Sequence, residues 1–125
     1  MRSARKILAL TTSRADWGHL SSPLRQLRKY EEIDLSLAVM GAHLSPEFGM
    51  TVGEIERDGF EIQHRIECLL SSDSDVGMAK TIGLAVLSLT EVLSKERPDL
   101  MLLMADRYEM LAPASVALAG MEAVV

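Results

Sequence analysis

Short apolar segments alternate along the chain with segments whose apolar residues recur at helical spacing. Four short segments are expected to be strands because each is bounded by polar residues: 6–11, 34–40, 60–66 and 100–104. The third alternates apolar and polar residues. The other three are almost continuously apolar, which is typical of strands buried on both faces of a parallel sheet. A fifth strand is expected to begin at residues 124–125.

Helical spacing predicts helices between these strands. The first is expected to follow a polar loop at residues 12–18 and to end near Tyr30, with Pro23 in its first turn, where no backbone N–H is needed. The second, at residues 51–58, is short and ends at Gly59.

The third predicted helix is long, since it runs from the polar residues 71–75 to just before Pro98. Its apolar face is expected to hold Met78, Ile82, Ala85, Val86, Leu89 and Leu93. A fourth helix is expected after the fourth strand, with a stripe of Leu111, Ala114, Ala117, Leu118 and Met121.

This alternation predicts an α/β fold in which right-handed crossovers join the strands of a parallel sheet covered on both faces. We expect a Rossmann-like, doubly wound sheet with strand order 3-2-1-4-5. No repeat or linker divides the 125 residues, so a single domain is expected over residues 1–125. Because an apolar run is only starting at the last residues, we expect this domain to be incomplete and the chain to be part of a longer protein.

Composition narrows the functional classes. The net charge of −5 argues against a broad nucleic-acid surface. The single cysteine, Cys68, excludes an internal disulfide, and neither it nor the three histidines show metal-ligand spacing. No segment is expected to approach the length of a membrane span, and the apolar stretch near the start is too short for a secretion signal. A cytoplasmic protein without a metal site is therefore expected.

In a doubly wound sheet, ligands bind outside the carboxyl ends of the strands. Three loops are expected to end there, at residues 11–18, 41–49 and 105–109. These loops also carry the most reactive side chains of the chain. We therefore expect the functional site at this edge of the sheet.

The first loop has two interpretations. Arg14 presents a planar donor fork suited to phosphate, beside the free N–H groups at the start of a helix. Alternatively, Arg14 pairs with Asp16 or another carboxylate while Asp16 caps the helix. Trp17 could stack on a base or cover the start of the helix. The glycine-rich dinucleotide fingerprint and the phosphate-loop motif are both absent, which disfavours nicotinamide cofactors and ATP hydrolysis.

The second and third loops also leave alternatives open. His43 is either an ordinary polar loop residue or a catalytic one. Asp106 directly follows a buried strand, where a carboxylate suits acid/base chemistry, but it could instead cap the next helix. Arg107 could hold a phosphate or form a surface ion pair.

With these loops, the chain resembles the hydrolysing UDP-N-acetylglucosamine 2-epimerases of sialic and related nonulosonic acid biosynthesis. The resemblance rests on SRADWG at residues 13–18, MGAHL at 40–44 with FGMT at 48–51, GEIERDGF at 53–60, and RPD at 97–99 leading to DRYE at 106–109. Their order and spacing cover almost the whole chain. Ala105 departs from the glycine usual in the family before the aspartate.

The resemblance implies a two-domain, glycosyltransferase-B-like fold that binds its UDP-sugar between the domains without a cofactor. It implies that residues 1–125 are most of the first domain and that the second domain is absent from this chain. It implies conversion of UDP-N-acetylglucosamine, or a diacetamido analogue, and water to the 2-epimeric free sugar and UDP. It further implies a homo-oligomer at full length, and that the chain by itself is inactive or nearly so.

Residue by residue, the resemblance makes Asp106 an acid/base group and His43 a second polar group of the active site. Arg14, Arg107, Asp16 and Gly18 would lie against the UDP portion.

Two other functions stay open. A non-catalytic nucleotide-binding or remnant domain is favoured by the early end of the chain and by Ala105. A non-hydrolysing epimerase is the nearer alternative, although SRAD and DRYE favour the hydrolysing kind.

Overall fold

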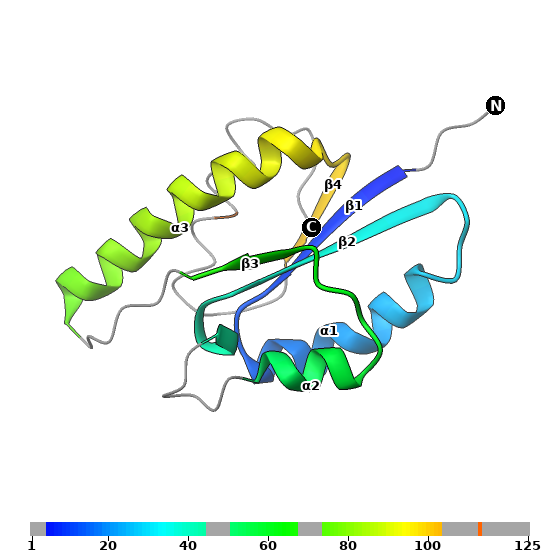
Figure 1. Cartoon of the computed structure of the whole chain (residues 1–125), viewed down its shortest axis with the longest axis horizontal. Coiled ribbons are helices and arrows are strands. Elements are labelled where there is room, and N and C mark those ends of the chain that lie inside the picture. Colours follow the sequence, from blue (N-terminus) through cyan, green and yellow to red (C-terminus); the bar gives the residue numbers. More distant parts are fainter. Residues whose placement is uncertain (1–4, 45–50, 68–73, 104–112, 114–125) are drawn as a thin grey trace.

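The computed structural model describes residues 5–44, 51–67, 74–103 and 113. Along the chain it contains β1 (Arg5–Thr11), α1 (Arg14–Leu27), β2 (Ile33–Met40), the 3-10 turn η1 (Gly41–Leu44), α2 (Val52–Arg57), β3 (His64–Ile66), α3 (Asp75–Glu96) and β4 (Leu100–Leu103) (Figure 1). Apart from residue 113, the predicted fourth helix lies outside the described residues, as do the predicted fifth strand and Ala105, Asp106 and Arg107.

The four strands form one sheet in the order β3-β2-β1-β4, and each adjacent pair is parallel. In the centre of the sheet, Ile7 of β1 is in register with Leu35 of β2 on one side and Leu100 of β4 on the other. The predicted α/β, Rossmann-like fold and its order 3-2-1-4 are therefore confirmed for these strands. The fifth position of the predicted order falls outside the described residues.

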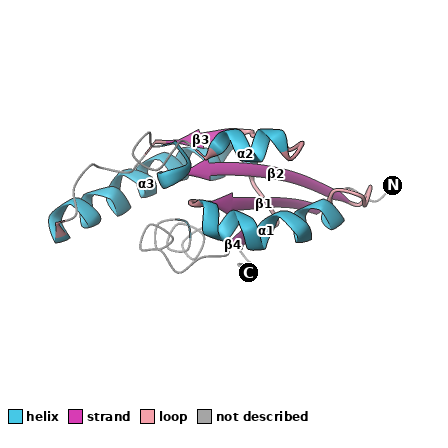
Figure 2. Cartoon of the chain, turned by 90° about the horizontal axis from the view of Figure 1, so that it is seen from below, coloured by secondary structure: helices cyan, strands magenta, loops and turns pink. Residues whose placement is uncertain are grey.

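Both faces of the sheet are buried because successive side chains of a strand point to opposite faces. On one face, Leu8 and Leu10 of β1 pack with Leu89 of α3 in one core cluster. On the other face, Ala9 of β1 packs with Leu20 of α1 and the rest of a second cluster, which also includes residues of α2. Figures 1 and 2 show α1 and α2 on the side of the sheet opposite to α3. This two-sided burial explains why the central strands are almost continuously apolar.

Helix α1 begins at Arg14, five residues earlier than the predicted loop at residues 12–18 allowed. Ser13 is its N-cap, and Ser13 and Asp16 form a capping box in which each side chain receives the backbone N–H of the other. The predicted loop to Gly18 was wrong because these polar side chains satisfy the first helical amides. Pro23 consequently lies inside the helix rather than in its first turn.

Strand β3 is shorter than predicted, since residues 60–63 are not part of it. Gly59 has φ of +86°, a left-handed conformation that suits glycine at the end of α2. Phe60 then turns into the core beside α1. Gln63 donates its backbone N–H to the Leu37 carbonyl (3.0 Å), and its side chain accepts the Leu37 N–H (2.7 Å). The side chain of Gln63 thus supplies a bond that an extended backbone would otherwise make.

The expectation that no segment approaches the length of a membrane span was wrong for α3. Its 22 residues have a mean hydropathy of 1.5 over the most apolar window, enough to cross a membrane by length and composition alone. In this fold one face of α3 packs on the sheet through Ala85, Leu89 and Leu93. The same length and composition are found in core helices of globular folds.

Replacing Pro23 by alanine should stabilise the chain. Pro23 is exposed within α1, and proline inside a helix removes a hydrogen bond and costs ~3 kcal/mol relative to alanine. We expect Pro23→Ala to raise the free energy of unfolding by about 1–3 kcal/mol, measured by urea unfolding. The neighbouring exposed Ser22→Ala is the control, and should change it by less than about 0.5 kcal/mol. Equal effects of the two substitutions would contradict this explanation.

Candidate functional site

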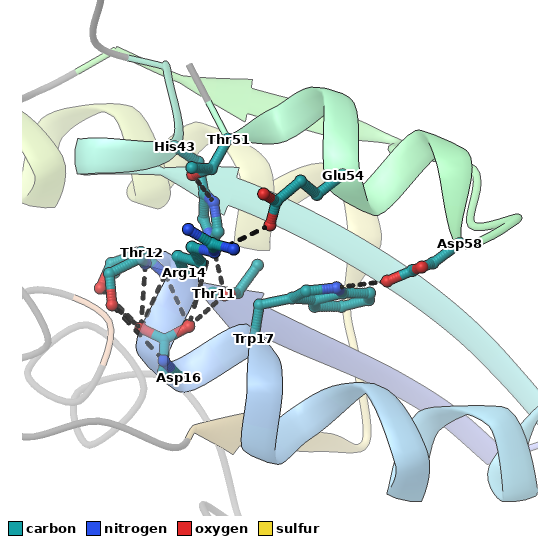
Figure 3. Close-up of polar contacts among 10 residues, drawn as sticks. Thr11, Thr12, Arg14, Asp16, Trp17, His43, Thr51, Glu54 and Asp58 are labelled. Atoms are coloured by element: carbon teal, nitrogen blue, oxygen red, sulfur yellow. Dashed lines mark hydrogen bonds and ion pairs between the residues drawn. The ribbon is translucent and has the colours of Figure 1, made fainter. Parts of the chain in front are cut away.

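The first two predicted loops meet at the carboxyl ends of β1 and β2 (Figure 3). The backbone N–H of His43, in η1, donates to the carbonyl of Thr12 across this edge (3.2 Å). This contact confirms that the two loops are adjacent. The third loop, which contains Asp106 and Arg107, lies outside the described residues.

The carboxylate of Asp16 is buried and accepts hydrogen bonds from three consecutive residues. Thr11 donates its hydroxyl. Thr12 donates its backbone N–H (3.1 Å) and its hydroxyl (2.9 Å). Ser13 donates its backbone N–H (3.1 Å) and its hydroxyl (3.2 Å). The structure thus shows the capping alternative for Asp16, whose oxygens are directed at its own loop. A contact of Asp16 with UDP stays a prediction.

The side chain of His43 is fully buried, and both its ring nitrogens have protein partners. Nε2 lies 2.8 Å from the hydroxyl of Thr11 and Nδ1 lies 2.7 Å from that of Thr51. Since Thr11 gives its proton to Asp16, it can only accept from the ring, so Nε2 carries the hydrogen. Nδ1 must then accept from Thr51. A directed chain of hydrogen bonds runs from Thr51 through His43 and Thr11 to Asp16.

Burial lowers the pKa of His43 below its ordinary value of 6.5, although the negative charges of Asp16 and Glu54 act in the opposite direction. The neutral ring agrees with the one-proton assignment above. With both nitrogens occupied, the ring of His43 connects strand β1 to the start of α2. A catalytic role for His43 stays a prediction.

Arg14 shows the contrasting environment, because it is the first residue of α1 and its side chain is 74% exposed. Its Nε lies 3.3 Å from a carboxylate oxygen of Glu54, in the first turn of α2. Arg14 therefore pairs with another carboxylate than Asp16. An exposed pair of this kind contributes little to stability, so an anion could replace Glu54 at low cost. Gly18, one turn further along α1, is exposed, and an added Cβ there would meet no atom within 4 Å.

Trp17 belongs to the core. Its indole N–H donates to Asp58 (2.9 Å), and its ring packs edge-on against Phe60 with centroids 5.1 Å apart. The sequence left two interpretations of Trp17, and the structure agrees with the second, in which its ring covers the start of α1. Base stacking would require this buried ring to leave its place between α1 and α2.

Sequence reasoning missed Thr11, Thr51 and Glu54. The pattern Ser-x-x-Asp at residues 13–16 is a capping-box signal that could have located the start of α1. Thr51 occupies the N-cap position of α2, but its hydroxyl serves His43 instead of its own helix. No local pattern indicates such a long-range use. Within the described residues, no group of three or more His, Cys, Asp or Glu side chains is placed to hold a metal ion.

Comparison with known proteins shows which family the chain resembles. The sequence profile of the UDP-N-acetylglucosamine 2-epimerase family matches residues 25–124. The chain is 45% identical over 114 residues to the hydrolysing UDP-N,N'-diacetylbacillosamine 2-epimerase of Legionella pneumophila, covering 91% of this chain and 30% of that protein. It is 37% identical over 116 residues to the hydrolysing GDP/UDP-N,N'-diacetylbacillosamine 2-epimerase of Campylobacter jejuni, covering 93% and 30%.

Solved structures show the same fold at lower identity. A crystal structure of a UDP-N-acetylglucosamine 2-epimerase matches 98% of this chain and 33% of its own length, with a TM-score of 0.81 and 18% identity. The Neisseria meningitidis enzyme bound to UDP-GlcNAc matches 91% and 29%, with a TM-score of 0.77 and 18% identity.

These matches confirm the resemblance drawn from the loop motifs. They also confirm an α/β, Rossmann-like first domain of the glycosyltransferase-B type. The chain spans about 30% of the length of the curated relatives it matches. Since the profile covers most of its residues, the chain belongs to the UDP-N-acetylglucosamine 2-epimerase family.

Proposed function

We propose that this chain is most of the first domain of a hydrolysing sugar-nucleotide 2-epimerase. The proposed reaction converts UDP-N-acetylglucosamine, or a diacetamido analogue, and water to the 2-epimeric free sugar and UDP. The observation that carries the proposal is the position of Arg14. Its side chain is exposed at the start of α1, and the turn before it is held by hydrogen bonds to the buried carboxylate of Asp16. Two relatives whose names include "hydrolyzing" support the same reaction class. The proposal also includes a cytoplasmic, homo-oligomeric protein.

The proposed reaction has two stages. In the first, a base removes the proton at C2 of the sugar, the C1–C2 double bond forms, and the bond from C1 to the UDP oxygen breaks. In the second, water adds its oxygen to C1 while a proton returns to C2 on the opposite face. Negative charge therefore grows on the leaving diphosphate, and a proton moves at carbon.

Within this proposal, Arg14 and Arg107 neutralise the diphosphate. A guanidinium suits this role because it donates two parallel hydrogen bonds to phosphate oxygens. The start of α1 adds N–H groups and the positive end of the helix dipole. Gly18 leaves the adjoining turn of α1 without a side chain. Asp106 is the proposed acid/base group at the sugar.

The buried network contributes rigidity to the proposed site. Asp16 fixes the turn immediately before Arg14, and His43 holds that turn to Thr51 at the start of α2. Glu54, the resting partner of Arg14, lies on the same helix as this second anchor. We propose that Asp16 and His43 act chiefly by keeping Arg14 and the sugar-facing loops in place, because preorganised groups need no rearrangement during the reaction.

Titration of UDP into the chain by calorimetry tests the phosphate contact. We expect Arg14→Ala to weaken UDP binding by about tenfold or more, because a charge-assisted hydrogen bond contributes ~1.5–3 kcal/mol. The matched control is Arg25→Ala, which removes another partly exposed ion pair of α1, that with Asp58 (3.7 Å), far from the loops. It should change the affinity less than twofold. Equal losses in the two variants would contradict a phosphate site at Arg14.

A chimaera tests the reaction. Residues 1–125 of this chain would replace the matched region of the Legionella pneumophila relative, and UDP release from UDP-N,N'-diacetylbacillosamine and from UDP-N-acetylglucosamine would be measured. We expect turnover, and a loss of ~100-fold or more in kcat for Asp106→Asn with UDP binding retained. Asp34→Asn, at the exposed start of β2, is the control and should keep full activity. A folded chimaera that binds UDP without turnover would favour the non-catalytic alternative.

The His43 network predicts a pH dependence of stability. Burial lowers the pKa of His43, so below pH 6.5 the unfolded chain binds more protons at this residue than the folded chain does. The contribution of the neutral, buried His43 to the free energy of unfolding is therefore complete above pH 6.5. It is lost as the pH falls toward the lowered pKa. The emission of Trp17, the single tryptophan, reports unfolding. We expect His43→Gln to be less stable at pH 7.5 and to lack this slope between pH 6.5 and 5. The exposed His19→Gln should keep both the stability and the slope. An unchanged slope in His43→Gln would show that other groups cause it.

A further inference from the structure

The described residues of the candidate site carry more negative than positive charge. Asp16 and Glu54 supply two carboxylates, whereas Arg14 supplies one guanidinium and the buried ring of His43 is neutral. A diphosphate would bring further negative charge to this edge of the sheet. The way in which each carboxylate is compensated therefore decides how strongly the site can hold an anion.

The two carboxylates differ in their partners. Asp16 is buried and accepts hydrogen bonds from its own turn, so it keeps its partners whether or not an anion binds nearby. Glu54 has one ion-pair partner within the part of the chain that the structure describes, namely Arg14. The contact joins Nε of Arg14 to one carboxylate oxygen of Glu54 (3.3 Å; Figure 3). An anion that binds this guanidinium therefore takes away the partner of Glu54.

The backbone of Glu54 is fixed beside Arg14. Glu54 lies in the first turn of α2 and directly precedes Ile55, which is fully buried in the core. The N-cap residue of this turn, Thr51, is hydrogen-bonded to His43 (2.7 Å). The side chain of Glu54 is 34% exposed, compared with 74% for Arg14. The carboxylate thus stays close to any anion that binds Arg14.

We propose that Glu54 is an internal competitor of the diphosphate for Arg14, and that it thereby sets the affinity of the site. Glu54 holds the guanidinium before the diphosphate binds, releases it on binding and takes it back as UDP leaves. A diphosphate displaces Glu54 because it offers more charge and more acceptor oxygens than one carboxylate. The displaced carboxylate stays near the bound anion, and the like charges weaken binding. This inference rests on the proposed function, since it assumes that Arg14 meets a diphosphate.

Arg57 provides a second partner for the displaced carboxylate. It follows Glu54 by three residues on α2, a spacing at which side chains are neighbours on a helix. Its Nη1 lies 3.6 Å from the position that a Cβ on Gly53 would occupy, so its guanidinium extends back along the first turn of α2. In the structure, Glu54 pairs with Arg14. Exchange of one exposed arginine for the other costs little, because exposed ion pairs contribute little to stability.

Calorimetric titration of the full chain with UDP, and separately with inorganic pyrophosphate, tests the competition. Glu54→Gln keeps the size of the side chain and removes its charge, so it should lower the Kd for both anions by about fivefold. Glu56→Gln is the matched control, because it removes the same charge from the same helix. Glu56 pairs with Arg65 (2.7 Å) instead of Arg14. The control should change either Kd by less than about 1.5-fold.

Nuclear magnetic resonance tests the Arg14–Glu54 pair without any ligand. The Nε–H signal of Arg14 is identified by its loss in Arg14→Ala. We expect Glu54→Gln to shift this signal and Glu56→Gln to leave it in place. UDP added to the original chain should shift it as well, because the partner of Nε changes. A signal that Glu54→Gln does not move would overturn the proposal.

The two anions distinguish a failure of the competition from a failure of the proposed function. If the original chain binds UDP but Glu54→Gln binds it no more tightly than Glu56→Gln does, the competition is overturned and the phosphate contact of the proposed function stands. Weaker binding in Glu54→Gln would also overturn it, because Glu54 would then position Arg14 for the anion. If pyrophosphate binds as expected and UDP does not, the competition holds and the proposed UDP contact fails. Absence of binding by both anions would overturn both.

Discussion

The buried carboxylate of Asp16 determines the geometry of the candidate site. It accepts hydrogen bonds from Thr11, Thr12 and Ser13, which are the last residue of β1 and the two-residue turn after it. An acceptor with this many donors makes a turn of two residues sufficient between a buried strand and a helix. The positions of Arg14, Gly18 and Trp17 on α1 all follow from where this helix begins. A single charge thus places both the exposed and the buried side chains of the first loop.

The same network reaches the second loop through one histidine. A buried polar network is favourable only when each member has its partners, and the chain from Thr51 through His43 and Thr11 to Asp16 meets that condition with one proton on the ring. The buried and the exposed residues of the site have different roles. Its buried members hold β1, β2 and α2 together, whereas Arg14, held only by an exposed ion pair, stays available for exchange.

Prediction from sequence succeeded where burial alone decides the outcome. The segments that form β2 and β4 are almost continuously apolar because the sheet is covered on both faces, and their order agrees with the one expected for a doubly wound sheet. It failed where polar side chains replace backbone partners. Residues 12–18 were interpreted as a loop, although Ser13 and Asp16 satisfy helical amides and α1 begins at Arg14. Strand β3 is shorter than predicted by residues 60–63, where the side chain of Gln63 bonds to Leu37. The prediction that Arg14, Asp16 and His43 lie at the carboxyl ends of the strands was correct. The hydrogen bond between Thr51 and His43 depends on tertiary structure, and no local sequence pattern indicates it.

The opposite edge of the sheet holds the carboxyl end of α3. There Glu96, near the end of α3, bonds to His64 (2.6 Å) and to Lys6 (3.1 Å), at the starts of β3 and β1. Burial raises the pKa of Glu96, but its bonds to His64 and Lys6 outweigh burial and leave the pKa below its ordinary value. These contacts anchor the carboxyl end of α3 at the edge far from the candidate site. Its amino-terminal half extends past the sheet (Figure 1). A helix that packs on a core with one face and exposes Val76, Leu84 and Leu87 elsewhere is apolar on more than one side, so length and hydropathy alone cannot distinguish it from a membrane span.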